Sequence, residues 1–277
     1  SGKTGDFTLT ATLIGAPTND TCATATAIAL DPGSQVINGT TTAAVNDYAG
    51  SCGASSTGED VVYVVTPSAS GKLTATLNPA SGFDSVLYAY KDACGVGANI
   101  VACKDEAGSS TDEVISFNVT AGTPYWVVVD GYSGDDGVYA LTLDLAAAPA
   151  NDKCANATAI AVSVGSPVTL NGDTTAATND DTGTCGGGAT GPDVAYAITP
   201  ATSGSLKISV DSTGSLDPVL YGGATTCGST TQTCKDATGA GGTETLTLTV
   251  VGGQTYWAIV DGYTGTKGPF TLTVTLN

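Results

Sequence analysis

The chain of 277 residues contains the same stretch of sequence twice, with the two copies 132 residues apart. APTNDTCATATAIAL begins at Ala16 and returns as APANDKCANATAIAV at Ala148, while AGTPYWVVVDGYSG at Ala121 returns as GGQTYWAIVDGYTG at Gly252. A long internal repeat determines the domain organisation before any local pattern is considered, because each copy must form a similar unit. The sequence therefore predicts two tandem domains, residues 14–145 and 146–277.

Residues 1–13 resemble the end of each repeat. SGKTGDFTLT at the start parallels SGDDGVYALT from Ser133 and TGTKGPFTLT from Thr264. We predict that this segment is an extra N-terminal β-strand, either the closing strand of a preceding unit or an arm that docks on another copy of the chain. An unpaired strand seeks a sheet edge or a groove. Phe7, Leu9 and Leu13 are therefore predicted to mediate self-association.

Apolar residues alternate with Thr in several segments of both repeats, as in 73–77, 246–250 and 270–276. This period of two is typical of strands with one buried and one wet face. Clusters of Gly, Pro, Asn, Asp and Ser separate the segments and have the chemistry of turns. We predict an all-β fold of two antiparallel, jelly-roll-like β-sandwiches.

Composition excludes several functions. The chain has 26 acidic and eight basic residues, a formal charge of −18 and no His. The charge disfavours nucleic acids and anionic membranes as partners. Without His there is no Ser-His-Asp triad, Cys-His pair or His-ligated zinc. Glycoside hydrolysis needs two carboxylates, but Glu59 and Glu106 have no acidic counterparts in the second repeat. We predict that the protein is not an enzyme, and no apolar run is long enough for a membrane span.

The eight cysteines lie in register, four to a repeat: Cys22, Cys52, Cys94 and Cys103, then Cys154, Cys185, Cys227 and Cys234. Such an even set favours disulfides and an extracellular or cell-surface location. The segment between the last two differs in length between repeats, as expected for a loop tied at its base. We therefore predict the pairs Cys94–Cys103 and Cys227–Cys234, which leaves Cys22–Cys52 and Cys154–Cys185. A four-thiolate zinc site is the alternative.

Aspartates recur at matching positions in both repeats. Calcium takes about six to eight oxygen ligands, which Asp-rich loops beside strands supply. The predicted calcium ligands are Asp84, Asp105 and Asp130, with Asp217, Asp236 and Asp261 in the second repeat. The alternative is that these carboxylates accept backbone hydrogen bonds in turns. No cofactor is expected to be required.

Some aromatic and asparagine residues are further candidates. Trp126 and Trp257 suit either a sugar-stacking platform or, more simply, the core. Tyr132 and Tyr263, in a repeated Asp-Gly-Tyr turn, are better placed to bind a ligand. Triplets that match the N-glycosylation pattern begin at Asn19, Asn38, Asn118 and Asn156.

Several short motifs together resemble the bacterial pre-peptidase C-terminal domain. They are Asn19-Asp20-x-Cys22, Asp60-Val-x-Tyr63, Asp84-x-Val86-Leu87-Tyr88, Cys103-Lys104-Asp105 and Tyr125 to Tyr132, with their counterparts in the second repeat. The resemblance implies a secreted, non-catalytic β-sandwich module, which in some members binds calcium or polysaccharide.

Two functions remain open. The first is a non-catalytic extracellular structural protein, a subunit or segment of a filament, sheath or surface stalk in which copies associate head to tail through β-strand contacts. The alternative is a polysaccharide- or calcium-binding accessory module of a secreted enzyme such as a peptidase.

Overall fold

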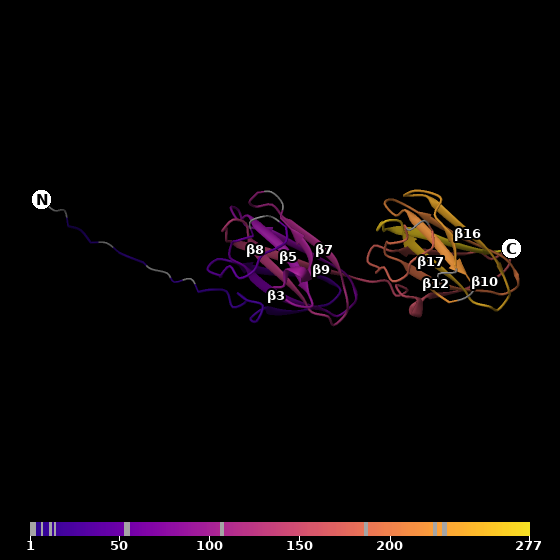
Figure 1. Cartoon of the computed structure of the whole chain (residues 1–277), viewed down its shortest axis with the longest axis horizontal. Coiled ribbons are helices and arrows are strands. Elements are labelled where there is room, and N and C mark those ends of the chain that lie inside the picture. The colour runs from indigo at the N-terminus through magenta and orange to yellow at the C-terminus, as the bar shows by residue number, and fades with distance from the viewer. Residues whose placement is uncertain are drawn as a thin grey trace. The chain divides into compact units, whose positions relative to one another are not determined.

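A computed structural model shows an all-β chain (Figure 1). It describes residues 4–6, 8–10, 13, 15–52, 56–105, 108–185, 188–223, 226–228 and 232–277. The chain divides into two compact units, with the main boundary between Leu145 and Ala146. The predicted tandem β-sandwich fold is confirmed.

Unit 1 consists of two sheets. The five-stranded sheet has the order β1-β3-β8-β5-β6 and the four-stranded sheet has the order β2-β9-β4-β7. The strands are β1 (Thr26–Leu30), β2 (Gly33–Thr40), β3 (Val61–Pro67), β4 (Gly71–Pro79), β5 (Ser85–Lys91), β6 (Ile100–Lys104), β7 (Glu113–Val119), β8 (Tyr125–Gly131) and β9 (Val138–Ala147), with a 3-10 turn η1 (Gly97–Asn99) before β6.

Unit 2 has the same topology, with sheet orders β10-β12-β17-β14-β15 and β11-β18-β13-β16. Its elements are the 3-10 turn η2 (Cys154–Asn156), β10 (Thr158–Val162), β11 (Val168–Asp173), β12 (Val194–Pro200), β13 (Gly204–Ser212), β14 (Pro218–Gly223), β15 (Thr233–Lys235), β16 (Thr243–Val250), β17 (Tyr256–Gly262) and β18 (Pro269–Leu276). No helix in the part of the chain that the structure describes is long and apolar enough to cross a membrane.

One strand pair in each unit departs from the antiparallel expectation. β1 pairs with β3 in parallel, and β10 pairs with β12 in the same way. Between β1 and β3 the chain passes through β2, which belongs to the opposite sheet. This long crossover allows a parallel return, which a tight hairpin does not.

The two sheets differ in how much of each strand is buried. In the four-stranded sheet, β4 and β18 alternate between buried and half-exposed residues, because one face packs on the core and the other faces solvent. In the five-stranded sheet, β5 and β8 are buried on both faces. A second apolar cluster covers the outer face of this sheet in unit 1, and we call it the outer cluster: Val62, Val86, Tyr88, Tyr90 and Val128, with partly buried residues that include Tyr48, Cys52, Cys94 and Cys103.

The repeated Asp-Gly-Tyr motif lies at the ends of β8 and β17. A Cβ atom on Gly131 would collide with the carbonyl oxygen of Asp135, and one on Gly262 would collide with that of Thr266. Glycine is therefore required at both positions by the close approach of two backbone segments.

The N-terminal segment forms no strand in its described residues, 4–6, 8–10 and 13. Leu9 is 82% exposed and Leu13 is 94% exposed, while Phe7 lies outside the described residues. The closing position in each unit is already taken by β9 or β18, so the predicted extra strand has no place within either sandwich. Its pairing with another copy stays a prediction.

All eight cysteines form disulfides, as predicted, but the predicted pairing is wrong. The bonds are Cys22–Cys94, Cys52–Cys103, Cys154–Cys227 and Cys185–Cys234. Cys94 and Cys103, although close in sequence, face different segments. Cys103 lies in β6 opposite Tyr88, whereas Cys94 lies in the loop over the outer face. In the chain-entropy account, loops of 49 to 73 residues contribute about 4 kcal/mol for each bond.

Tryptic digestion without reduction will distinguish the two pairings, because Cys94 and Cys103 lie between Lys91 and the cleavage site at Lys104. We expect this peptide to be linked to the peptide that contains Cys22 and Cys52. The equivalent link in unit 2 joins peptides 154–207 and 208–235. An unlinked peptide 92–104 with an internal disulfide, detected by mass spectrometry, would contradict the structure.

Candidate functional site

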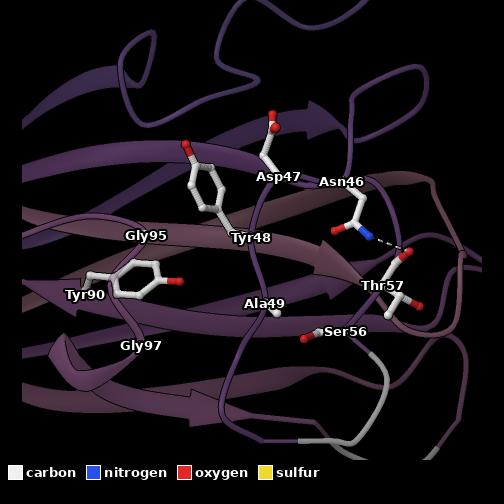
Figure 2. A pocket seen from close by; sticks show the side chains of 9 residues that line it. All are labelled: Asn46, Asp47, Tyr48, Ala49, Ser56, Thr57, Tyr90, Gly95 and Gly97. Atoms are coloured by element: carbon white, nitrogen blue, oxygen red, sulfur yellow. Dashed lines mark hydrogen bonds between the residues drawn. The ribbon is translucent and has the colours of Figure 1, made fainter.

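Unit 1 has a surface pocket of about 390 Å³ beside its outer cluster. Loop residues that follow β2, precede β3 and follow β5 form its walls, together with one residue of β5 (Figure 2). The lining residues are Asn46, Asp47, Tyr48, Ala49, Ser56, Thr57, Tyr90, Gly95 and Gly97.

Contacts between the loops hold the pocket open without a ligand. The side-chain amide of Asn46 donates to the carbonyl oxygen of Thr57 at 3.1 Å (Figure 2). The hydroxyl of Tyr48 accepts from the main-chain N–H of Cys22 at 2.9 Å. Gly95 has a φ of +77°, and a Cβ atom there would lie 3.0 Å from the Tyr48 ring. The Tyr48 ring therefore packs against Gly95, and another residue at this position would be strained.

The pocket combines two tyrosines with exposed amide and carboxylate groups. Tyr48 is half-buried, and Tyr90 is 1% exposed. Burial, together with the negative charges of Asp60 and Asp130, raises the pKa of Tyr90 to about 12, so its hydroxyl stays protonated. Asn46 and Asp47 are exposed at the rim. Aromatic carbon with hydroxyl, amide and carboxylate groups suits a neutral polyhydroxylated molecule.

The sequence-predicted ligand residues lie elsewhere. Tyr132 lines a separate cavity of about 270 Å³ with Asp84, Asp105 and Gly108. Tyr263 is 36% exposed in unit 2. Tyr125 and Tyr256, rather than the neighbouring tryptophans, are the buried members of the two Tyr-Trp pairs, and Trp126 is a half-buried neighbour of the outer cluster.

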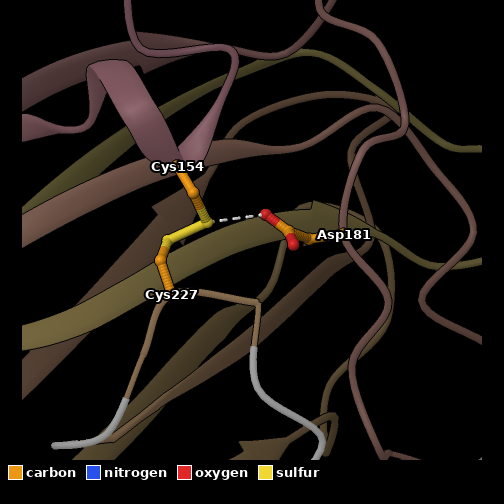
Figure 3. A group of neighbouring side chains, drawn as sticks. All are labelled: Cys154, Asp181 and Cys227. Carbon is orange, nitrogen blue, oxygen red and sulfur yellow. Dashed lines mark hydrogen bonds between the residues drawn. A yellow bond between two sulfur atoms is a disulfide. The ribbon is translucent and has the colours of Figure 1, made fainter.

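Unit 2 has lost the aromatic groups of this pocket. Asp181 stands in place of Tyr48, and Gly223 stands in place of Tyr90. Asp181 Oδ2 lies 3.0 Å from the sulfur of Cys154 (Figure 3). A disulfide sulfur has no hydrogen to donate, so this is a close sulfur–oxygen contact.

A metal site needs several ligand atoms close together. In the described part of the chain, Cys154, Asp181 and Cys227 form the one group of three or more His, Cys, Asp or Glu side chains whose ligand atoms lie within 4.8 Å of one another. The two sulfurs are bonded to each other, and a metal requires thiolates instead. The oxidised unit therefore offers no zinc ligands here.

Each unit buries a pair of carboxylates beneath the loops. Asp60 and Asp130 are 0% exposed, as are their counterparts Asp193 and Asp261. The hydroxyl of Tyr88 donates to Asp130 at 3.0 Å, and that of Tyr221 donates to Asp261 at 3.1 Å. This repeated acid cluster is the strongest electrostatic feature that the two units share.

Burial raises the pKa of all four acids far above the ordinary value of 3.8. The pKa is about 7 for Asp60 and about 8 for Asp130, where the charge of Asp60 contributes. It is about 8 for Asp193 and about 7 for Asp261. The cause is the same at all four positions, because a carboxylate away from solvent is poorly stabilised in its charged form.

The predicted calcium trios are not assembled. Asp130 and Asp261 belong to the buried pairs, whereas Asp84 shares a cavity with Asp105. Burial, then the charges of Asp105 and Asp135, raise the pKa of Asp84, and burial, then Asp236 and Glu244, raise that of Asp217. Calcium binding near Asp84 or Asp217 stays a prediction.

The candidate glycosylation sites differ in accessibility. Asn19 is 8% exposed, and its amide donates to the carbonyl oxygen of Val62 at 3.2 Å, so the folded protein does not present it for modification. Asn38, Asn118 and Asn156 are exposed. Glycosylation at these three stays a prediction.

Sequence reasoning missed Tyr48 and Tyr90. The available signal was the difference between repeats, because a pair of aromatic residues in one copy is replaced by Asp and Gly in the other. Their proximity was not visible, since 42 positions, including the strands β3 and β4, separate them.

A family model described as galactose binding domain-like and associated with the T9SS matches residues 18–136 and again 150–257. The chain belongs to this family. The two matched stretches correspond to the two sandwiches, and no curated protein matches the chain. The T9SS association and the four disulfides place this galactose binding domain-like protein outside the cytoplasm, as a secreted or cell-surface protein.

Among solved structures, the chain is similar to the pre-peptidase C-terminal domain of a Bacillus anthracis collagenase, with 17% identity, a TM-score of 0.30, and coverage of 43% of this chain and 96% of that one. It is also similar to PliG, a lysozyme inhibitor from Aeromonas hydrophila, with 12% identity, a TM-score of 0.28, and coverage of 44% and 98%. A fucolectin from Morone saxatilis has 9% identity, a TM-score of 0.23, and coverage of 78% and 85%.

The buried acids predict a pH dependence of stability in this galactose binding domain-like protein. Their pKa values are raised in the folded state, so the folded chain binds more protons than the unfolded chain between about pH 4 and pH 8. The stabilisation is present below pH 4 and is lost as the pH rises through 7 to 8. Calorimetry should give a higher melting temperature at pH 5 than at pH 8.5.

The double variant Asp60→Asn, Asp193→Asn should reduce this difference, since one charge of each pair is removed. The control replaces two exposed acids, Asp136→Asn with Asp144→Asn, which changes the net charge equally and leaves the pairs intact. A melting temperature that is independent of pH in the unmodified protein would contradict the prediction.

Proposed function

We propose that this protein is a non-catalytic extracellular carbohydrate-binding module and that unit 1 holds its sugar site. The observation that carries the proposal is the pocket in which Tyr48 and Tyr90 stand beside exposed amide and carboxylate groups. Membership of a galactose binding domain-like family supports the same class of ligand. The module would serve as the accessory part of a secreted protein such as a peptidase.

The overall charge favours a neutral ligand. The protein has a formal charge of −18, and Asp47 lies at the rim of the pocket. A uronic acid or a sulfated sugar would be repelled, whereas the hydroxyl groups of a neutral sugar donate to a carboxylate without that cost. The proposed ligands are therefore neutral saccharides.

Head-to-tail assembly into a filament stays a prediction. The exposed Leu9 and Leu13 are compatible with it. The pocket provides a direct chemical rationale for binding, so we place the binding function first.

The test is titration calorimetry of the intact protein with galactose, mannose and neutral oligosaccharides. Tyr48→Ala should weaken binding about tenfold, which corresponds to ~1.4 kcal/mol and to the loss of one aromatic contact. Tyr90 is 1% exposed and belongs to the pocket wall, so Tyr90→Phe, which keeps the buried ring, should keep the affinity of the unmodified protein.

The matched control is Asp181→Ala, at the position in unit 2 that corresponds to Tyr48. It should leave sugar affinity unchanged, because the proposed site lies in unit 1 alone. If no neutral saccharide binds at millimolar concentration, or if Tyr48→Ala binds as well as the unmodified protein, the proposal is wrong.

A further inference from the structure

We infer that Asp60 is the positioning residue of the proposed sugar loop and that its buried carboxyl group, in the protonated form, keeps this loop in its binding conformation. The inference rests on the proposed function for its ligand, but the state of the loop can be measured without any ligand. The loop in question is residues 46–49, which we call the latch loop.

One carboxylate oxygen anchors the main chain of the latch loop, in addition to the side-chain contacts of Asn46 and Tyr48. Asp60 Oδ2 accepts hydrogen bonds from the main-chain N–H groups of Asp47 at 2.8 Å and Tyr48 at 2.9 Å. Both donors belong to residues that line the pocket. Because Asp60 is 0% exposed, it cannot touch a ligand, and its effect on binding passes through the loop.

The other oxygen of Asp60 shows why a proton is needed. Oδ1 is fully buried and has no hydrogen-bond partner among the residues described. An ionised carboxylate in this position leaves a desolvated charge with half of its acceptors unsatisfied, which is costly. A neutral acid keeps the carbonyl oxygen that the two N–H groups require and removes the charge.

The surroundings of Asp60 add negative charge. The titratable groups that face it are Asp20 before β1, Asp47 and Tyr48 in the latch loop, Tyr88 and Tyr90 in β5, and Asp130 in β8. The charges of Asp20, Asp47 and Asp130 repel an ionised Asp60 or are repelled by it. None of these groups is cationic.

The same arrangement occurs in unit 2. Asp193 Oδ2 accepts from the main-chain N–H groups of Asp180 at 2.9 Å and Asp181 at 3.0 Å, and Asp193 Oδ1 is also buried without a partner. The loop in unit 2 has lost the tyrosine, but the buried acid below it is unchanged. The hydrogen bonds from a buried acid to the loop therefore occur without the tyrosine of the proposed ligand site. Unit 2 thus serves as the control for the experiment.

A bound cation is the rival explanation for two buried carboxylates. Calcium takes about six oxygens or more. No three acidic side chains that include Asp60 lie within 4.8 Å of one another in the described part of the chain. A proton requires no such cage, so the observations favour the proton.

Hydrogen–deuterium exchange of the intact protein tests the inference, with rates corrected for the intrinsic effect of pH. Asp60→Ala should accelerate exchange of the Asp47 and Tyr48 amides at least tenfold. Asp60→Asn should keep exchange near that of the unmodified protein, because its amide carbonyl still accepts both bonds. In the unmodified protein, exchange of these amides should rise between pH 6 and pH 9, and in Asp60→Asn this rise should be smaller.

Sugar affinity should follow the same profile, falling by at most tenfold per pH unit, the limit for one linked proton. Asp193→Ala should accelerate exchange at Asp180 and Asp181 only and leave sugar affinity unchanged. Unchanged exchange in Asp60→Ala, a flat pH profile in the unmodified protein, or Asp60→Asn behaving like Asp60→Ala would each overturn the inference.

Addition of calcium chloride, and then of a chelator, distinguishes a protonated acid from a bound calcium ion. Added calcium should leave exchange at Asp47 and Tyr48 unchanged, whereas slower exchange that a chelator reverses would overturn the protonated Asp60. If exchange behaves as expected but no saccharide binds, the proposed function is wrong and the role of Asp60 in the latch loop is supported. If saccharides bind at Tyr48 but exchange is insensitive to Asp60, the role of Asp60 is wrong and the proposed function is supported.

Discussion

The structure of each unit depends on the cover over the outer face of its five-stranded sheet. β5 and β8 are buried on both faces, so this sheet needs apolar material on each side. On one side that material is the opposite sheet. On the other it is a set of loops, which have few regular hydrogen bonds of their own and are fixed by two disulfides in each unit. The disulfides therefore determine where the loops lie, and the loops carry the candidate site.

The separation between the sheets and the loops that cover them explains how two similar units differ in chemistry. The strands, the disulfides and the buried acids are shared, because any change in them would disturb the packing beneath the loops. Two positions at the pocket differ between the units, one half-buried and one buried in the outer cluster. Tyr48 and Tyr90 in unit 1 become Asp181 and Gly223 in unit 2 without any change in topology. Functional sites on loops held by a rigid scaffold are expected to diverge in this way.

The buried acids join the scaffold to the loops. A carboxylate that accepts two main-chain N–H groups ties a loop to the layer below it. Because this carboxylate is buried away from solvent, its charged form is poorly solvated. The hydrogen bonds that it accepts are therefore sensitive to protonation. Structural support and sensitivity to pH thus have one physical cause at Asp60 and Asp193.

The sequence by itself determined the tandem units, the sandwich fold and the involvement of all eight cysteines, because repetition and a period of two are local patterns. It identified the strands of the four-stranded sheet most clearly, since their wet face preserves the alternation, as in residues 73–77. It did not determine which cysteines bond, that Asp130 joins Asp60 instead of Asp84, or that Tyr48 meets Tyr90. These contacts join segments that are far apart in the chain, and only the folding of loops over the five-stranded sheet brings them together.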